Sequence, residues 1–181
     1  MRIIAGTYRR RTIKAPDGHT TRPTTDRARE SMFNLIFSRL GLDGVRVLDL
    51  FCGSGSLGLE ALSRGAGAVH FVDLEPRVIA VAEENAATLD DDLPCSFELG
   101  EAFDVLRRTA PATYDLVLAD PPYDMPDVSR LPAAVKHVLG PGGLFVLEHD
   151  RHLDVADHPD CETSRTYGRT NVSVFMYGDE S

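Results

Sequence analysis

From residue 45 onward, short apolar runs alternate with segments that carry apolar residues at helical spacing. Alternating strands and helices produce right-handed crossovers and a parallel sheet that helices cover on both faces. Five such strands are predicted, at residues 45–50, 68–72, 96–99, 114–119 and 144–148. A helix over 128–139, interrupted or restarted at Pro132, is predicted to be closed by the glycines and proline at 140–143. Two last strands, near 162–167 and 172–177, have no helix between them and therefore place one antiparallel strand in the sheet.

The segment before this alternation has a different character and divides the chain. Residues 2–5 and 11–14 are predicted to form a short β-hairpin. Residues 15–25 contain two prolines and a glycine and are predicted to be a connector, after which a helix begins. We therefore expect an N-terminal hairpin arm with its connector over residues 1–24 and a single domain over residues 25–181.

The first strand-to-helix turn carries three glycines, Gly53, Gly55 and Gly58, with the spacing Gly-x-Gly-x-x-Gly. Such a turn lets the backbone approach a ligand closely at the carboxyl ends of the strands. Asp73 ends the second strand, where a carboxylate accepts hydrogen bonds from ribose hydroxyls. The pattern predicts a cofactor that contains a nucleoside.

Asp49 distinguishes two cofactors that share this pattern. It lies four residues before Gly53, where a dinucleotide fold usually carries an apolar residue that faces the pyrophosphate. A carboxylate there would repel phosphates and attract a cation, so we expect ligand contact in preference to capping of backbone amides. S-adenosylmethionine (SAM) has an ammonium group, a sulfonium and no phosphate, and the closing strand pair resembles the seven-stranded sheet of class I SAM-dependent methyltransferases. A nicotinamide dehydrogenase is the alternative.

The stretch Asp120-Pro121-Pro122-Tyr123 directly follows the fourth strand. Two adjacent prolines lack N–H groups and fix φ, so they end the strand and stiffen the corner. From the residues alone, such a corner suits a planar ligand with a hydrogen-bond donor on its edge. The stretch also resembles the (Asp/Asn)-Pro-Pro-(Tyr/Phe) sequence of methyltransferases that modify amino nitrogens, and this resemblance implies that the ligand is the exocyclic amine of a guanine or adenine. Such an amine is a poor nucleophile because its lone pair is delocalised into the ring. The Asp120 carboxylate and the Pro121 carbonyl would accept its N–H bonds and stabilise the positive charge that grows on nitrogen. Tyr123 would stack on a base taken out of its helix.

The charge of the chain is unevenly distributed. The net charge is −9 over 181 residues, yet residues 1–29 hold eight basic and two acidic residues, or +6, which leaves −15 for the remainder. A basic arm on an acidic body predicts local contact with a polyanion. A solvated hairpin edge whose Lys and Arg block aggregation is the alternative.

Several other classes of protein are not supported. Three cysteines and six histidines show neither a disulfide framework nor the spacing of metal ligands, so no metal is expected. No apolar run is long enough to cross a membrane, and no signal peptide is recognised, so a cytoplasmic location is expected. Pro94-Cys95 resembles the nucleophile of carbon-5 pyrimidine methyltransferases, but it enters the third strand, far in sequence from the fourth-strand exit.

Over its whole length the chain resembles the RsmD-type family of bacterial 16S ribosomal RNA guanine-N2 methyltransferases. Asp120–Tyr123 is similar to the (Asp/Asn)-Pro-Pro-(Tyr/Phe) sequence of enzymes that methylate amino nitrogens. The segments that carry the resemblance are residues 2–6, 22–30, 49–55, 57–66 and 120–123. The most specific is 22–30, Arg-Pro-Thr-Thr-Asp-Arg-Ala-Arg-Glu. The resemblance implies methyl transfer from SAM to the N2 amine of a guanine, conventionally numbered 966, in the assembled or nearly assembled small ribosomal subunit.

The resemblance also implies the residues of the site. Glu101 stands where the class I architecture commonly presents an acid, usually Asp, to the adenine amino group, and a helix-start acid is the alternative. Asp73 stands where the family more often has Glu. The catalytic set is Asp120, Pro121, Pro122 and Tyr123. The cofactor-binding set is Asp49, Phe51, Gly53, Gly55, Gly58, Asp73, Leu74, Glu101, Ala102 and Asp120. The RNA-binding set is Arg9, Arg10, Arg11, Lys14, Arg22, Arg27 and Arg29.

The expected partner is 16S rRNA within the small subunit, bound by a monomer. Two further functions stay open on the sequence. One is amino-methylation of another substrate, either a DNA adenine or cytosine or a protein glutamine. The other is a non-catalytic ribosome assembly factor that binds SAM structurally, which the intact Asp120–Tyr123 stretch disfavours.

Overall fold

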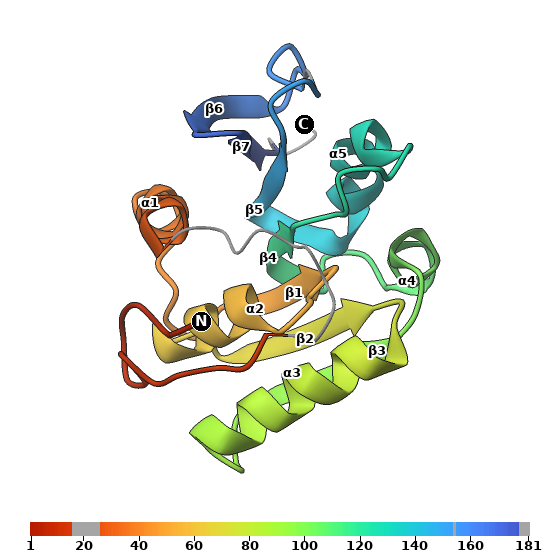
Figure 1. The fold of residues 1–181 in the computed structure, drawn as a ribbon. Coiled ribbons are helices and arrows are strands. Elements are labelled where there is room, and N and C mark those ends of the chain that lie inside the picture. Colours follow the sequence, from red (N-terminus) through yellow and green to blue (C-terminus); the bar gives the residue numbers. More distant parts are fainter. Residues whose placement is uncertain (16–25, 154, 178–181) are drawn as a thin grey trace.

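The computed structural model describes residues 1–15, 26–153 and 155–177, which form one seven-stranded sheet with helices on both faces (Figure 1). The strands are β1 (Arg46–Leu50), β2 (Ala68–Asp73), β3 (Cys95–Leu99), β4 (Tyr114–Ala119), β5 (Leu139–Asp150), β6 (Cys161–Tyr167) and β7 (Thr170–Met176). The α-helices are α1 (Asp26–Phe37), α2 (Ser56–Ser63), α3 (Pro76–Leu89), α4 (Ala102–Arg108) and α5 (Leu131–Val135). The 3-10 turns η1 (Val128–Arg130) and η2 (Lys136–Val138) flank α5.

The strand order is β3-β2-β1-β4-β5-β7-β6. Strands β1 to β5 run parallel to their neighbours among themselves, and β7 runs antiparallel to both β5 and β6. The prediction of a mostly parallel sheet with one antiparallel strand near the C-terminus is therefore confirmed. The order reverses at β1 and β4, and in open sheets of this kind ligands bind outside the carboxyl ends of the strands at such a point.

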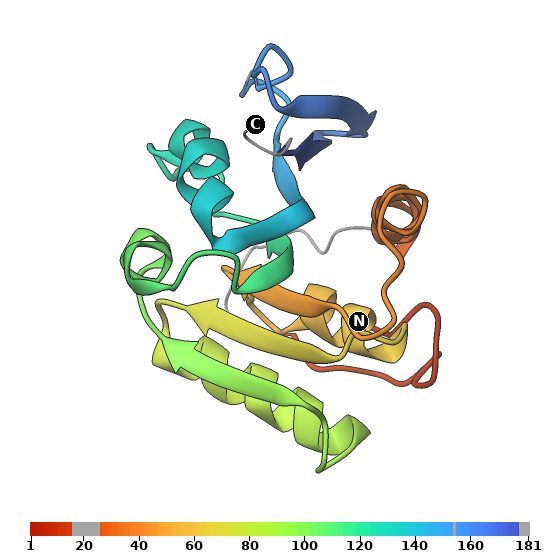
Figure 2. The ribbon, with the colours of Figure 1, turned by 180° about the vertical axis from the view of Figure 1, so that it is seen from behind.

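Two hydrophobic layers hold the helices to the sheet. Helices α1, α2 and α3 cover one face, and α4 and α5 cover the other (Figures 1 and 2). In β4, Leu116 and Leu118 pack toward the first layer, whereas Val117 and Ala119 pack toward the second. Because central strands are buried on both faces, their sequences are continuous apolar runs. Among the described helices, none is long and apolar enough to cross a membrane.

The N-terminal arm packs against the body. A single antiparallel bridge, Arg2 to Thr12, replaces the predicted pair of strands. Ile3 and Ile13 are 1% and 2% exposed and belong to the core beside α1 and α2. Gly6 has φ +82°, and a Cβ there would lie 1.7 Å from the carbonyl oxygen of Ser63. The arm is therefore fixed by burial and by a close backbone approach that only glycine permits.

Of two predictions near β5, one is wrong and one is confirmed. Residues 140–143 lie inside β5 and do not form a helix-closing turn, because Leu139 already pairs with Tyr114 and a shift in register follows that pair. The predicted interruption at Pro132 is confirmed, because the segment is divided into η1, α5 and η2 and ends at Val138. Proline lacks the N–H that a continuous helix would need at that position.

Candidate active site

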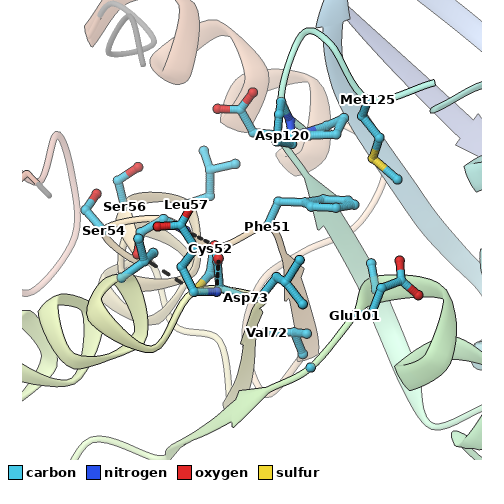
Figure 3. A pocket seen from close by; sticks show the side chains of 18 of the residues that line it. Phe51, Cys52, Ser54, Ser56, Leu57, Val72, Asp73, Glu101, Asp120 and Met125 are labelled. Atoms are coloured by element: carbon cyan, nitrogen blue, oxygen red, sulfur yellow. Dashed lines mark hydrogen bonds between the residues drawn. The ribbon is translucent and has the colours of Figure 1, made fainter. Parts of the chain in front are cut away.

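A cavity of about 420 Å³ lies at the carboxyl ends of the central strands, within the size range of small-molecule sites. The loop after β1, the end of β2, the β3–α4 turn and the corner after β4 form its walls (Figure 3). The predicted site residues that line it are Phe51, Gly53, Asp73, Leu74, Glu101, Ala102, Asp120, Pro121, Pro122 and Tyr123. The structure thus brings the predicted cofactor half and the predicted chemical half into one pocket.

The loop after β1 is built around left-handed backbone conformations. Gly53 has φ +56°, and Phe51, which is not glycine, has φ +58°. A bulky residue in this region costs about 1–3 kcal/mol, and such strain is concentrated at binding and catalytic sites. The N–H of Gly53 donates to Oδ2 of Asp73 at 3.0 Å, which ties the loop to the end of β2. The Phe51 side chain projects into the pocket between Asp120 and Val72 (Figure 3).

Asp49 lies beneath the pocket and is not among the residues that line it. It is 1% exposed, and its Oδ2 accepts a hydrogen bond from the N–H of Gly58 at 2.9 Å. The expectation of direct ligand contact is thus corrected in favour of backbone capping. Gly58 itself is a packing residue, since an added Cβ would lie 2.3 Å from Cε1 of Phe71. Gly55, with φ +79°, precedes α2 and also lies outside the lining residues.

The environment of Asp49 favours its neutral form. Burial raises the pKa of Asp49 to about 8, repulsion from Asp73 adds to the shift, and the hydrogen bond from Gly58 opposes it. A cation held in the pocket above would favour the ionised form of the carboxyl group. Asp49 therefore supports the site by holding the first turn of α2 through its hydrogen bond from Gly58.

Asp73 and Glu101 are held by backbone amides. Besides Gly53, Asp73 accepts the N–H of Glu75 at 3.1 Å through Oδ1. Glu101 accepts the N–H of Asp104 at 2.9 Å and so caps α4. The alternative role of Glu101 as a helix-start acid is therefore present in the structure, on a residue that also lines the pocket.

The pocket wall is acidic. Among the described residues that line it, four carry carboxylates and none is Lys or Arg; the four are Asp73, Glu75, Glu101 and Asp120. A pyrophosphate requires cationic or amide donors, and four carboxylates would repel it. This composition suits a cationic ligand without phosphate and disfavours a nicotinamide dinucleotide.

The corner after β4 presents polar groups on a rigid base. Ala119 is fully buried and Pro121 is buried, whereas Tyr123 is 55% exposed at the mouth of the pocket. Asp120 is exposed and lines the pocket. Its pKa is raised well above the ordinary value by desolvation first, then by repulsion from Glu148 and from Asp49.

One predicted RNA-binding residue is wrong. Arg29 is 1% exposed inside α1, and its guanidinium donates to the carbonyl oxygen of Arg2 at 2.6 Å and to Asp26 at 3.3 Å. A buried guanidinium cannot reach a phosphate, so Arg29 connects α1 to the arm. Arg27 is exposed on the same helix, and Arg22 lies outside the described residues.

Two other predicted RNA-binding residues, Arg11 and Lys14, contact helix α3. Arg11 donates to the carbonyl oxygen of Thr88, and Lys14 pairs with Glu84. Helix α3 is about 21 Å long at 1.5 Å per residue, and Arg11 contacts its C-terminal end, whereas the pocket lies at its N-terminal end. Arg9 and Arg10 are exposed in the turn of the arm, which packs on Ser63 at the far end of α2. An RNA bound by Arg11 and also by the active site would therefore have to extend along the length of α3, about 21 Å.

Some lining residues carried no signal in the sequence. The apolar ones are Met1, Ala15, Cys52, Leu57, Val72, Val78 and Met125. Val72 precedes Asp73, the last residue of β2, and its position near a strand end could have indicated it. Met125 and Met1 come from irregular segments that only the tertiary structure brings to the pocket.

Comparison with known proteins identifies the family. A family model described as "Conserved hypothetical protein 95" matches residues 1–176. The chain belongs to this RsmD-type family. YlbH of Bacillus subtilis is 36% identical over 182 residues, which cover 97% of this chain and 98% of YlbH. Ribosomal RNA small subunit methyltransferase D of Escherichia coli (strain K12) is 36% identical over 123 residues, which cover 68% of this chain and 60% of that relative.

Solved structures of similar proteins share the fold of this RsmD-type chain over two thirds of its length or more. The structure of yhhF from Escherichia coli superposes with a TM-score of 0.83 at 27% identity and covers 98% of both chains. A SAM-dependent methyltransferase from Mesorhizobium loti superposes with a TM-score of 0.54 at 27% identity over 67% of this chain and 52% of that one. The predicted class I SAM-dependent methyltransferase fold is confirmed, and the protein is an enzyme of the methyltransferase class.

Proposed function

We propose that this RsmD-type protein transfers a methyl group from SAM to the N2 amine of the guanine conventionally numbered 966 in 16S rRNA of the small ribosomal subunit. One observation carries the proposal. A pocket whose described wall has four carboxylates and no Lys or Arg is continuous with the Asp120–Tyr123 corner. Such a pocket accommodates a cationic cofactor and places it beside a group that accepts hydrogen bonds from an amine.

The described residues fit SAM. Asp73 would accept hydrogen bonds from the ribose hydroxyls, because the amides of Gly53 and Glu75 already fix its carboxylate and leave lone pairs on both oxygens. Phe51 and Ala102 provide apolar walls for an adenine. When bound, SAM supplies a methyl group activated on a sulfonium centre.

The corner would hold the amine. The Asp120 carboxylate and the Pro121 carbonyl would accept the two N–H bonds of the exocyclic nitrogen and stabilise its developing positive charge. Both groups lie on a backbone that two prolines restrict, so they need little reorganisation. The raised pKa of Asp120 makes its carboxylate a good acceptor for the proton that the methylated nitrogen releases. Tyr123, exposed at the mouth, would stack on the guanine ring.

The choice of ribosomal RNA is supported by the relatives. The Escherichia coli relative and a 37% identical relative from Haemophilus influenzae are both named Ribosomal RNA small subunit methyltransferase D. We further propose that a monomer acts in the cytoplasm, that residues 1–24 form an arm on the methyltransferase domain, and that Arg9, Arg10 and Arg27 contact rRNA phosphates. Phosphate contacts would position the RNA without selecting its sequence.

The test uses unmethylated small subunits, labelled SAM and mass mapping of the modified nucleotides. The wild type is expected to place one methyl group on N2 of guanine 966. Asp120→Ala should lose turnover and retain subunit binding. Asp124→Ala is the matched control, because Asp124 is exposed just beyond the corner and lies outside the residues that line the pocket.

Three outcomes would contradict the proposal. Methylation of DNA or of a protein glutamine in preference to the subunit would refute the rRNA substrate. An Asp120→Ala variant with full turnover would refute the role of the corner. Calorimetry that detects binding of NAD but not of SAM would refute the cofactor.

A further inference from the structure

Tyr123 has a specific partner in a segment far from it in the sequence. Its hydroxyl lies 3.1 Å from Oγ1 of Thr170, the first residue of β7 and 47 positions later in the chain. The contact joins two separate segments at the edge of the pocket wall that Tyr123 lines, because Tyr123 follows β4 and Thr170 follows the turn between β6 and β7. The ring that is proposed to stack on the guanine is thus held at its polar end by a strand of the sheet.

Thr170 is a well-fixed anchor. Its backbone pairs with Tyr167 of β6 on one side and with Asp150 of β5 on the other. A two-residue turn joins β6 to β7, and its first residue, Gly168, has φ +66°, as tight hairpin turns of this kind require. Threonine is also β-branched, so its χ1 angle is restricted in a strand. The hydroxyl therefore occupies a defined position.

Tyr123 lacks comparable restraint from its own segment. Prolines fix the backbone before it, but its side chain is 55% exposed, and residues 122–124 have no regular secondary structure. An exposed tyrosine side chain samples several rotamers on the nanosecond timescale. A hydrogen bond at its hydroxyl is the contact that selects one orientation before a base arrives.

We propose that Thr170 is a positioning residue for methyl transfer, which acts by holding Tyr123 in the orientation that stacks on the target guanine. The inference rests on the proposed function of the Asp120–Tyr123 corner. It also assigns the turn between β6 and β7 to the RNA side of the active site. Thr170 touches neither cofactor nor reacting atoms and acts only through Tyr123.

The test compares Thr170→Val, Thr170→Ser and Thr166→Val in single-turnover methylation of unmethylated small subunits. Valine retains the shape and strand preference of threonine and removes the hydroxyl, whereas serine retains the hydroxyl. Thr166→Val is the matched control, because Thr166 lies in the same hairpin and its hydroxyl bonds Asn171 instead of Tyr123. Thermal unfolding of each variant checks that the hairpin remains folded.

Thr170→Val is expected to lower the single-turnover rate about 3- to 10-fold, the effect of one neutral hydrogen bond. The KM for subunits should change less than twofold. Thr170→Ser should restore most of the rate, and Thr166→Val should match the wild type. In a Tyr123→Phe background, Thr170→Val should have no further effect, because the bond is already absent.

Failures of the two proposals are distinguishable. A wild type that methylates no RNA would refute the proposed function together with this inference. A wild type that is active with a Thr170→Val variant of equal rate would refute the inference alone. Equal losses in Thr170→Val and Thr166→Val, or a Thr170→Val loss that persists in the Tyr123→Phe background, would likewise show that Thr170 acts through the hairpin and not through Tyr123.

Discussion

Replacing Arg29 by Ala tests whether this residue stabilises the fold or contacts RNA. The side chain is 1% exposed, and its guanidinium donates to the carbonyl oxygen of Arg2 at 2.6 Å and to Asp26 at 3.3 Å. Burial lowers the pKa of Arg29, and attraction from the fully buried Glu60 opposes that shift. Removing the guanidinium therefore leaves a buried carboxylate with less compensating charge and an arm carbonyl without its donor.

The magnitude follows from these contacts. Removing one partner of a buried ion pair costs about 3–5 kcal/mol. The pair with Asp26 counts for less because the Asp26 side chain is 46% exposed and screened by water. The charge-assisted bond to Arg2 accounts for about 1.5–3 kcal/mol, and Glu60 keeps its other hydrogen bonds. We expect a loss of about 3 kcal/mol, which lowers the Tm of a chain of this size by about 6–12 °C.

The measurement is urea unfolding with Arg27→Ala as the control. Arg27 is exposed two positions earlier in the same helix, so its replacement should change the free energy of unfolding by less than about 0.5 kcal/mol. At a temperature where both variants are folded, Arg29→Ala should bind subunits as the wild type does. The reasoning would be refuted if Arg29→Ala were as stable as Arg27→Ala and bound subunits more weakly.

Three other perturbations have defined outcomes. Gly58→Ala forces a Cβ to within 2.3 Å of Phe71 and should destabilise the protein by about 1–3 kcal/mol in urea unfolding; an unchanged midpoint would contradict the close packing. Asp49 keeps its proton up to a pKa of about 8 when folded and loses it at lower pH when unfolded, so wild-type stability should fall as pH rises from 5 to 8. Asp49→Asn lacks this group, and its stability relative to the wild type should therefore increase over that range; a constant difference would argue against the buried neutral carboxyl. Glu148→Gln removes repulsion that raises the pKa of Asp120, and since Asp120 must be ionised to accept the amine, the acid limb of the pH–rate profile should move to lower pH. A shift to higher pH would contradict that assignment.

The sequence predicted the strands best where local pattern and tertiary environment agree. Strands β1 and β4 are mostly apolar because both of their faces are covered, and both were found within a residue of the predicted bounds. The pattern failed at residues 140–143, where glycine and proline indicated a turn but pairing with β4 keeps the segment in β5. It also overstated the hairpin at the N-terminus, where burial of Ile3 and Ile13 matters more than strand pairing.

The chain order by itself determined the contents of the pocket. Residues that end or follow parallel strands meet at one edge of a sheet, so Asp73 and Asp120 had to lie near the loop after β1. Sequence adjacency could not show how deeply each side chain lies. Asp49 belongs to the same segment as the pocket-lining Gly53, and Arg29 to the same segment as the exposed Arg27. Both Asp49 and Arg29 are nevertheless 1% exposed. Burial depends on which helix covers a position, and that is settled by packing between distant segments.

The contacts between distant elements were decided only by the tertiary structure. Thr170 meets Tyr123 because the antiparallel insertion of β7 brings the β6–β7 turn to the carboxyl end of β5, beside β4. The arm lies along α3, which places Arg11 at the far end of that helix from the pocket. Local periodicity records which face of an element is buried, whereas the pairing of elements far apart in sequence depends on the free energy of the whole packed arrangement.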